Sequence, residues 1–238
     1  MNINSIINTQ TIIKSRALTL SLGTLTFVSI LCSLFYVFLV VPNESVMGPV
    51  QRIFYYHVSS AVAAYLMVGI LFVSSICYLR SKANEWDMLA YGATCVAFLF
   101  CSIVLGTGMI WGHSAWNTWW RWEPRLVSFL ILWLILFSYL LLRNFTEGAG
   151  AQQKNFSAVL GIISAVNVPI VVFSVKLLEK SEQLHPQVLE SRGLMDFRYV
   201  LGLIISCVAI NLLALMLLKL KLGNLLLKDL IYRLHLES

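Results

Sequence analysis

The sequence predicts an all-α integral membrane protein of six transmembrane helices, with a tryptophan-rich outer loop between the third and the fourth. Two observations predict this fold class. Of the 238 residues, 59% are hydrophobic and only 12% are charged, which is not the composition of a water-soluble domain. The apolar residues also gather in six runs of about 20, the length at which a helix crosses roughly 30 Å of hydrocarbon. We expect residues 1–238 to form a single membrane domain.

Each of the six runs predicts one span, because no charged residue lies deep inside any of them. The first run is too long for a cleaved signal peptide, lacks a small-residue cleavage site and precedes five more runs, so we expect it to stay in the mature chain. Short connections that carry charge separate the later runs from one another. The expected spans are residues 17–41, 59–79, 88–110, 126–142, 157–177 and 199–218.

Lysine and arginine in these connections predict the orientation. Ten of the 17 lie on the side that holds both termini, which we therefore expect to be cytoplasmic in a bacterial inner membrane, or to face the matrix in a mitochondrial one. The other seven lie on the opposite side, where the rule disfavours them. They are either solvated loop charges or residues that contact an anionic ligand. These seven are Arg52, Arg121, Arg125, Lys176, Lys180, Arg192 and Arg198.

Tryptophan is concentrated in the segment 111–125, which holds five of the seven tryptophans of the chain. Indole offers a large flat apolar surface and one N–H that prefers a polar neighbour, so such a cluster suits a membrane–water boundary or a flat ligand. If the segment runs partly as a helix in the interface, a helical period of 3.6 places four of its residues on one face. These are Trp116, Trp119, Trp120 and Glu123.

Histidines lie mostly on the same outer face as this segment. His57 is at the outer end of the second span, His113 is inside the tryptophan segment and His185 is in the connection between spans five and six, whereas His235 is in the inner tail. A flat aromatic surface, imidazoles and arginines together suit haem. Its macrocycle is flat and apolar, its iron takes one or two axial imidazoles, and its propionates pair with guanidinium groups.

Several other chemistries lack their motifs. The five cysteines lie within or at the edges of the spans without a C-x-x-C pair, which argues against thiol–disulfide transfer and a zinc motif. No Walker A loop and no catalytic nucleophile are evident, so we expect no enzyme, and any use of ATP belongs to a partner. Two alternatives stay open. One is an electron-transfer cytochrome b, whose histidines usually lie inside spans, and the other is a transporter permease subunit whose tryptophan segment is only an interfacial anchor.

A family resemblance points the same way. The elements Trp111-Gly112, Trp116, Trp119-Trp120, Trp122 and Arg125-Leu126 resemble the WWD signature of the haem-handling proteins of cytochrome c maturation, in the form of the haem exporter protein C (CcmC) family. The pattern Arg52-Ile53-x-Tyr55-x-His57-Val58 resembles the histidine segment of that family, and residues 167–175 resemble its fifth span. His185 stands where the family has its second outer histidine. The similarity covers about residues 20–218.

The sequence also departs from that family. Glu123 stands where the signature has aspartate, and the paired tryptophans that precede the second histidine are absent before His185. His113 is not part of the signature. The residues around His57 therefore match the family pattern better than those before His185, and the resemblance implies no role for His113.

The resemblance implies a function in haem handling and export. Such a protein binds haem b as transient cargo at the periplasmic face and delivers it to the haem chaperone CcmE. Its implied partners are the ABC-transporter subunits CcmA and CcmB, the small membrane protein CcmD and the lipid bilayer, with no nucleic acid. The residues expected to contact haem are Trp111, Trp116, Trp119, Trp120, Trp122, Glu123, Arg52, Arg121, Arg125 and Arg198, with His57 and His185 as axial ligands of the iron.

Overall fold

The structure is a computed structural model that describes residues 16–44, 47–145, 150–177 and 197–237. Within these ranges it is helical and holds no strand, and six helices are long and apolar enough to cross a membrane, as predicted. The helices are α2 (Arg16–Phe35), α3 (Ile53–Ser81), α4 (Asn84–Trp116), α5 (Pro124–Phe145), α6 (Gly150–Leu177) and α7 (Phe197–Glu237). A π-helical turn, η1 (Tyr36–Val40), extends α2, and a 3₁₀ turn, η2 (Pro49–Arg52), leads into α3.

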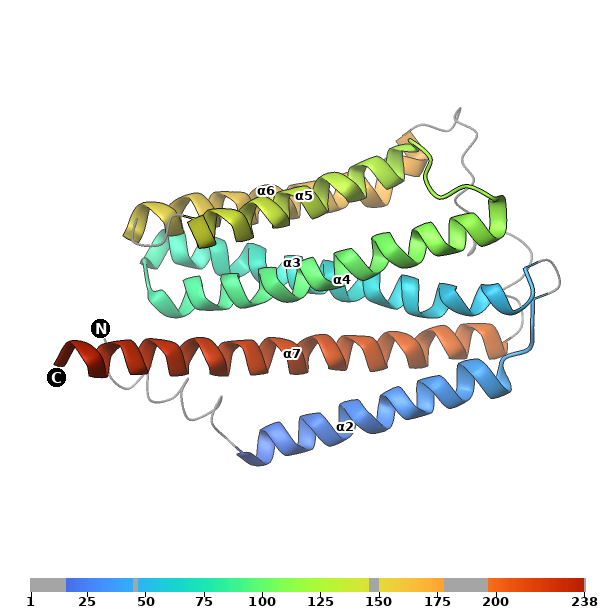
Figure 1. The fold of residues 1–238 in the computed structure, drawn as a ribbon, viewed down its shortest axis with the longest axis horizontal. Coiled ribbons are helices and arrows are strands. Elements are labelled where there is room, and N and C mark those ends of the chain that lie inside the picture. The colour runs from blue at the N-terminus through green and yellow to red at the C-terminus, as the bar shows by residue number, and fades with distance from the viewer. Residues whose placement is uncertain (1–15, 45–46, 146–149, 178–196, 238) are drawn as a thin grey trace.

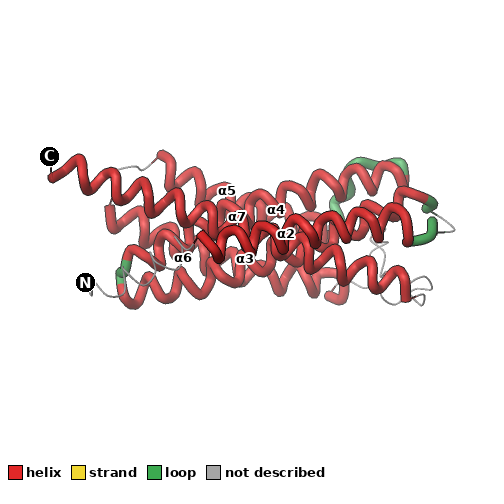
Figure 2. Tube along the Cα trace, turned by 90° about the horizontal axis from the view of Figure 1, so that it is seen from below, coloured by secondary structure: helices red, strands yellow, loops and turns green. Residues whose placement is uncertain are grey.

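Helices α3 and α4 form the central pair of the bundle. The hairpin of α5 and α6 packs on one flank of this pair, α7 packs on the other, and α2 lies mainly against α7 (Figure 1). All six run roughly along one long axis, which Figure 2 shows from below. The bundle therefore has two ends. We call the end with His57, Trp116 and Pro124 the pocket end, and the end with Asn84 and Arg143 the ion-pair end.

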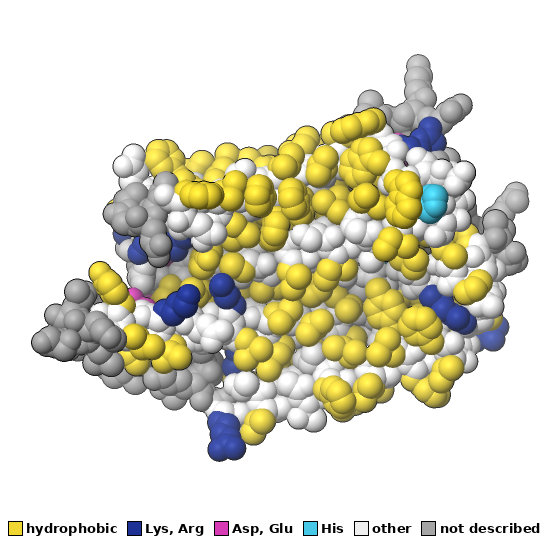
Figure 3. Space-filling view, viewed as in Figure 1, with side chains coloured by type: hydrophobic (Ala, Val, Ile, Leu, Met, Phe, Trp, Pro, Cys, Tyr) yellow, Lys and Arg dark blue, Asp and Glu magenta, His cyan; other side chains and the backbone are white. Residues whose placement is uncertain are grey.

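Apolar side chains form both the interior and the flanks. A core of buried residues, most of them from α3, α4 and α5 and a few from α6 and α7, holds the bundle together; Leu71, Phe100 and Leu132 belong to it. A smaller cluster around Tyr55 and Trp111 lies at the pocket end. On the outside, apolar side chains cover the length of the face in Figure 3, whereas lysine and arginine gather toward its ends. Such a surface belongs in lipid, where it needs no water-facing polar cover.

Helices continue past the apolar runs that predict them. The helical backbone of α4 runs from the apolar stretch through Ile110 to Trp116, and α7 runs to Glu237. Hydropathy marks only the apolar stretch, whereas a helix ends where its backbone is capped or broken. The segment 111–125 is consequently not one loop, because its first six residues complete α4 and only residues 117–123 are irregular.

Candidate functional site

A cavity of about 290 Å³ lies at the pocket end, between α3, α4, the start of α5 and the irregular segment 117–123. Its volume is near the lower limit of small-molecule sites, which are usually apolar with a few placed polar groups. This description fits the lining, which is mostly aromatic and aliphatic. Eight of the residues singled out in the sequence line it, namely His57, Trp111, Trp116, Trp119, Trp120, Arg121, Glu123 and Arg125.

The cavity wall opposite α3 owes its shape to the way α4 ends. Asn117 adopts the left-handed conformation with φ +54°, and its N–H donates to the His113 carbonyl at 2.9 Å, which terminates α4. The chain then folds back over Gly112, where a Cβ would lie 3.1 Å from the Thr118 carbonyl oxygen. Pro124 begins α5 at a position where proline's missing N–H costs nothing.

This ending overturns one expectation from the sequence. The interfacial helix proposed for Trp116, Trp119, Trp120 and Glu123 is wrong, because α4 ends at Trp116 and the left-handed cap at Asn117 separates it from the other three residues. The four side chains nevertheless line the same cavity. The irregular backbone of residues 117–123 brings the other three to Trp116, and no shared helical face is involved.

The five tryptophans of the segment fall into three environments. Trp111 is only 3% exposed and packs edge-on against Phe54, with ring centroids 5.9 Å apart, so it belongs mainly to the core. Trp116, Trp119 and Trp120 form the aromatic wall of the cavity. Trp122 is 79% exposed, touches the edge of the Trp120 ring and does not line the cavity. An exposed indole of this kind suits the membrane–water boundary.

His57 lies one turn into α3 and is held against α4. Its Nδ1 is 3.0 Å from the Thr107 hydroxyl oxygen, and its ring meets the Trp111 ring at 62° with centroids 5.9 Å apart. The backbone of Gly108 passes beneath the ring so closely that a Cβ there would lie 3.1 Å from Cε1. The imidazole is therefore half-buried, lines the cavity and has little freedom to turn.

Below His57 the cavity continues into the apolar part of the bundle. It follows α3 from His57 to Tyr65, two helical turns or about 12 Å deeper. Its walls there come from α4 and α5, with Val104, Leu105 and Phe129 facing the same space. The lining thus combines an aromatic and polar mouth with an apolar floor.

Two arginines line the cavity, and their partners differ. The Arg121 Nε lies 3.9 Å from a carboxylate oxygen of Glu123, whose side chain is largely buried. Arg125 makes no ion pair with any residue in the described part of the chain. Arg125 is therefore the better placed of the two to pair with an anionic ligand.

Other residues expected at the site lie elsewhere. Arg52 lies over the Phe38 ring at 5.7 Å, on the side of α2, and neither it nor Arg198 lines the cavity. His113 stacks on the Trp119 ring at 4.1 Å and 7°, and it too is absent from the lining. His185 lies outside the described residues, as does the side chain of His235.

Sequence inspection missed the residues that hold His57 and deepen the cavity. Thr107 and Gly108 look like ordinary small residues in an apolar span, and Tyr65 and Phe129 look like core aromatics. The one available signal was helical spacing, since Thr107, Gly108 and Trp111 share one face of α4. Spacing alone does not tell which helix that face meets.

The lining suits a planar ligand that brings its own metal. Within the described residues, no three His, Cys, Asp or Glu side chains converge as they would around a bare ion. A single imidazole beside aromatic faces instead suits an iron whose equatorial positions are filled by a macrocycle, and a nearby guanidinium suits the carboxylates of that macrocycle. The described residues therefore fit haem.

Comparisons with known proteins agree with this chemistry. The sequence model of the family described as "Heme exporter protein C" matches residues 4–235. The chain is 27% identical to Heme exporter protein C of Bradyrhizobium diazoefficiens over 72% of its own length and 65% of the relative's. It is 32% identical to the protein of the same name from Paracoccus denitrificans over 52% of each chain.

A third relative carries a different name. The chain is 34% identical to Cytochrome c biogenesis protein CcsA of Prochlorococcus marinus, over 36% of its own length and 27% of the relative's. Across the three relatives, the chain therefore spans at most about two thirds of the protein that it matches.

Proposed function

Because the chain belongs to the Heme exporter protein C family, we propose that it handles haem for cytochrome c maturation and holds it in the cavity at the pocket end. The observation that carries the proposal is the convergence of His57, an aromatic wall and Arg125 on one cavity. Haem needs an axial ligand for its iron, a flat apolar surface for its macrocycle and a counterion for its propionates. The three groups can supply these in that order. No enzymatic step is part of the proposal.

Each group has a proposed role. His57 is an axial ligand of the iron, Trp116, Trp119 and Trp120 stack on the macrocycle, and Arg125 pairs with a propionate. Arg121 is the second candidate for that pairing, since Glu123 already partly neutralises it. Arg52 and Trp122 lose support as contacts, because neither lines the cavity.

A second axial ligand is proposed from the family resemblance, namely His185. The segment that carries it connects α6 to α7, and both of these helices pack on α3, the helix that bears His57. Two neutral imidazoles would saturate the iron and leave no position for oxygen chemistry. Such a site favours storage and handover over catalysis.

Handover needs a site that releases its cargo to another protein. We propose the chaperone CcmE as the recipient and CcmA, CcmB and CcmD as further partners, with the cavity on the periplasmic side of a bacterial inner membrane or its mitochondrial counterpart. Trp119, which lines the cavity and is 53% exposed, supports a site open at one side.

The absorption spectrum of the purified protein tests this function against its alternatives. We expect partial haem occupancy that rises when the chaperone and transporter subunits are produced together with the chain. A stoichiometric haem that cycles between redox states would instead indicate an electron-transfer cytochrome. Complete absence of haem under all these conditions would leave the tryptophans as an interfacial anchor only.

Orientation has its own test. Single cysteines are introduced at Ser114, near the pocket end, and at Ser81, near the ion-pair end, after the five native cysteines have been replaced; both serines are exposed. An impermeant thiol reagent added from the periplasmic side should label the cysteine at position 114 and not the one at 81. The opposite pattern would reverse the proposed side of delivery.

A further inference from the structure

The hydroxyl of Thr107 makes three polar contacts, and together they determine where its proton goes. Its oxygen is 2.7 Å from the Ile103 carbonyl oxygen, 3.3 Å from the Val104 carbonyl oxygen and 3.0 Å from Nδ1 of His57. A hydroxyl has one proton to donate, and a carbonyl oxygen can only accept. The shortest contact, to Ile103, is the usual bond of a helical threonine to the carbonyl four residues earlier.

Because the hydroxyl proton is committed to the backbone, the oxygen faces His57 as an acceptor. Nδ1 must then carry the proton of the neutral imidazole. Neutral imidazole has only one N–H, so Nε2 is left with its lone pair.

Resting on the haem site proposed above, we propose that Thr107 is a positioning residue for the iron ligand: its hydroxyl holds the Nδ1 proton of His57 and thereby leaves Nε2 to bind the iron. Histidines that bind metals commonly donate their other ring N–H to a fixed acceptor, which sets both the tautomer and the orientation of the ring. Gly108 complements this contact, since a Cβ at that position would lie 3.1 Å from Cε1 of the imidazole, closer than an ordinary van der Waals contact.

The same helix offers a matched control. Ser102 on α4 donates to the Phe98 carbonyl at 2.8 Å and accepts the indole N–H of Trp133 at 2.8 Å. Its hydroxyl thus has the same arrangement as that of Thr107, a backbone bond to the fourth residue before it and an aromatic N–H donor. It lies outside the cavity lining, so its loss should affect packing without affecting the ligand.

The test is a titration of the purified full-length protein with hemin, followed by absorption spectroscopy. Thr107→Val keeps the shape of the side chain and removes the acceptor, so we expect about tenfold weaker binding and a changed low-spin spectrum. Thr107→Ser should restore both properties, because it restores the hydroxyl. Ser102→Ala should leave affinity and spectrum as in the wild type.

Each outcome separates this inference from the function on which it rests. If Thr107→Val binds hemin with wild-type affinity and spectrum while His57→Ala does not, His57 is a ligand and Thr107 does not position it. If His57→Ala itself binds as the wild type does, the proposed haem site is wrong. Should Thr107→Val fail to insert, Thr107→Ala removes the same oxygen without a branched Cβ, and the same criteria apply to it.

Discussion

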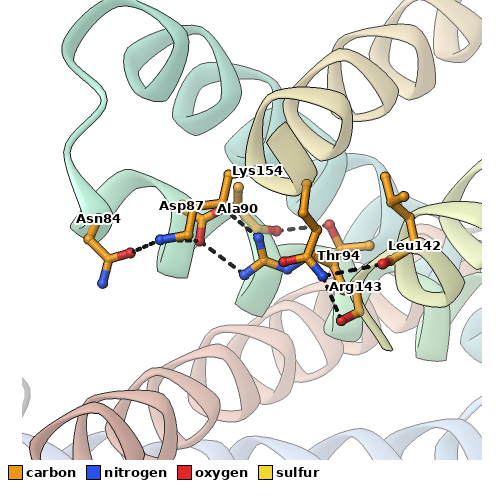
Figure 4. Close-up of polar contacts among 8 residues, drawn as sticks. Asn84, Asp87, Ala90, Thr94, Leu142, Arg143 and Lys154 are labelled. Atoms are coloured by element: carbon orange, nitrogen blue, oxygen red, sulfur yellow. Dashed lines mark hydrogen bonds and ion pairs between the residues drawn. The ribbon is translucent and has the colours of Figure 1, made fainter. Parts of the chain in front are cut away.

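The two ends of the bundle differ in how their charged side chains are paired. At the ion-pair end, Asp87 receives two hydrogen bonds from Arg143, at 2.7 and 3.0 Å, and lies 3.8 Å from Lys154 (Figure 4). Lys154 also donates to Asn84. At the pocket end, Arg121 lies 3.9 Å from a carboxylate oxygen of Glu123, whereas Arg125 lines the cavity with His57 and has no ion pair within the described residues. The charges at the ion-pair end satisfy each other, whereas Arg125 at the pocket end lines space that a ligand can occupy.

This comparison shows that a high density of polar contacts does not identify the proposed haem site. The ion-pair end has more of them, including two bonds from Gln153 to the carbonyls that end α5, and they join α4, α5 and α6. A buried ion pair chiefly fixes geometry, because desolvation of its charges offsets much of their attraction. The end that we propose to be functional is instead the one where a cavity, an imidazole and a cation converge.

The largest effect is expected from breaking the ion pair. Asp87→Asn leaves Arg143 and Lys154 without their carboxylate, and Arg143 is only 14% exposed. Loss of one partner of a buried pair typically costs about 3–5 kcal/mol, so we expect a strongly lowered thermal unfolding midpoint. Hemin affinity of the protein that remains folded should not change.

Replacing both partners sharpens that comparison. Asp87→Leu with Arg143→Leu removes the pair without stranding a charge on either residue, so the double variant should be clearly more stable than Asp87→Asn. If the ion-pair end does not contribute to the haem site, both variants should bind hemin with wild-type affinity. Weaker binding with intact folding would mean that the ion-pair end contributes to the site.

The aromatic wall should give the next largest effect. Stacking contributes on the order of 1 kcal/mol for each aromatic contact, so Trp119→Ala combined with Trp120→Ala should weaken hemin binding roughly 30-fold. Trp122→Ala is the matched control in the same segment, because its side chain does not line the cavity. Equal affinities in the double variant and the control would reduce the cluster to a membrane anchor.

Two glycines of α4 allow a test of the close packing that holds the His57 ring in place. Gly108→Ala places a Cβ 3.1 Å from Cε1 of His57, which forces the ring to move, whereas Gly106→Ala meets nothing within 4 Å. Displacing the proposed iron ligand in this way should weaken hemin binding roughly tenfold, with a shift in the absorption spectrum. Gly106→Ala should change neither the affinity nor the spectrum. An identical response of the two variants would contradict the proposal that packing against Gly108 positions His57.

The smallest effect is expected for the counterion. Arg125→Gln removes one charged contact with a propionate, worth about 1 kcal/mol, so hemin affinity should fall about fivefold. Arg121→Gln should have less effect, because Glu123 already pairs with Arg121. Hemin dimethyl ester, which lacks the carboxylates, should bind wild type and Arg125→Gln equally well. A fivefold loss with the ester too would show that Arg125 acts through something other than the propionates.

Sequence alone predicted the six helices, because their apolar runs have the length that a membrane demands. It did not predict the end of α4, since the left-handed cap at Asn117 is a local backbone event that hydropathy does not register. The difference between the buried Trp111 and the exposed Trp122 follows from that cap. The contact between Asp87 and Arg143 was equally out of reach, because it joins residues far apart in the chain.

Within the site, sequence singled out His57 and the tryptophans because imidazole and indole are rare and chemically distinctive. Thr107 is neither, and a threonine in an apolar span usually bonds its own helix, as this one does. Only the packing of α3 against α4 brings its oxygen to His57. The proposed iron ligand could therefore be singled out by its residue type, whereas the residue that holds it could not.

Haem content of His57→Ala, measured beside the wild type in the same membranes, tests the central claim most directly. We expect the wild type to retain haem, and His57→Ala to lose most of it or to hold it with an altered spectrum while inserting in equal amount. Retention of the same haem, with the same spectrum, by His57→Ala would contradict the assignment of the cavity.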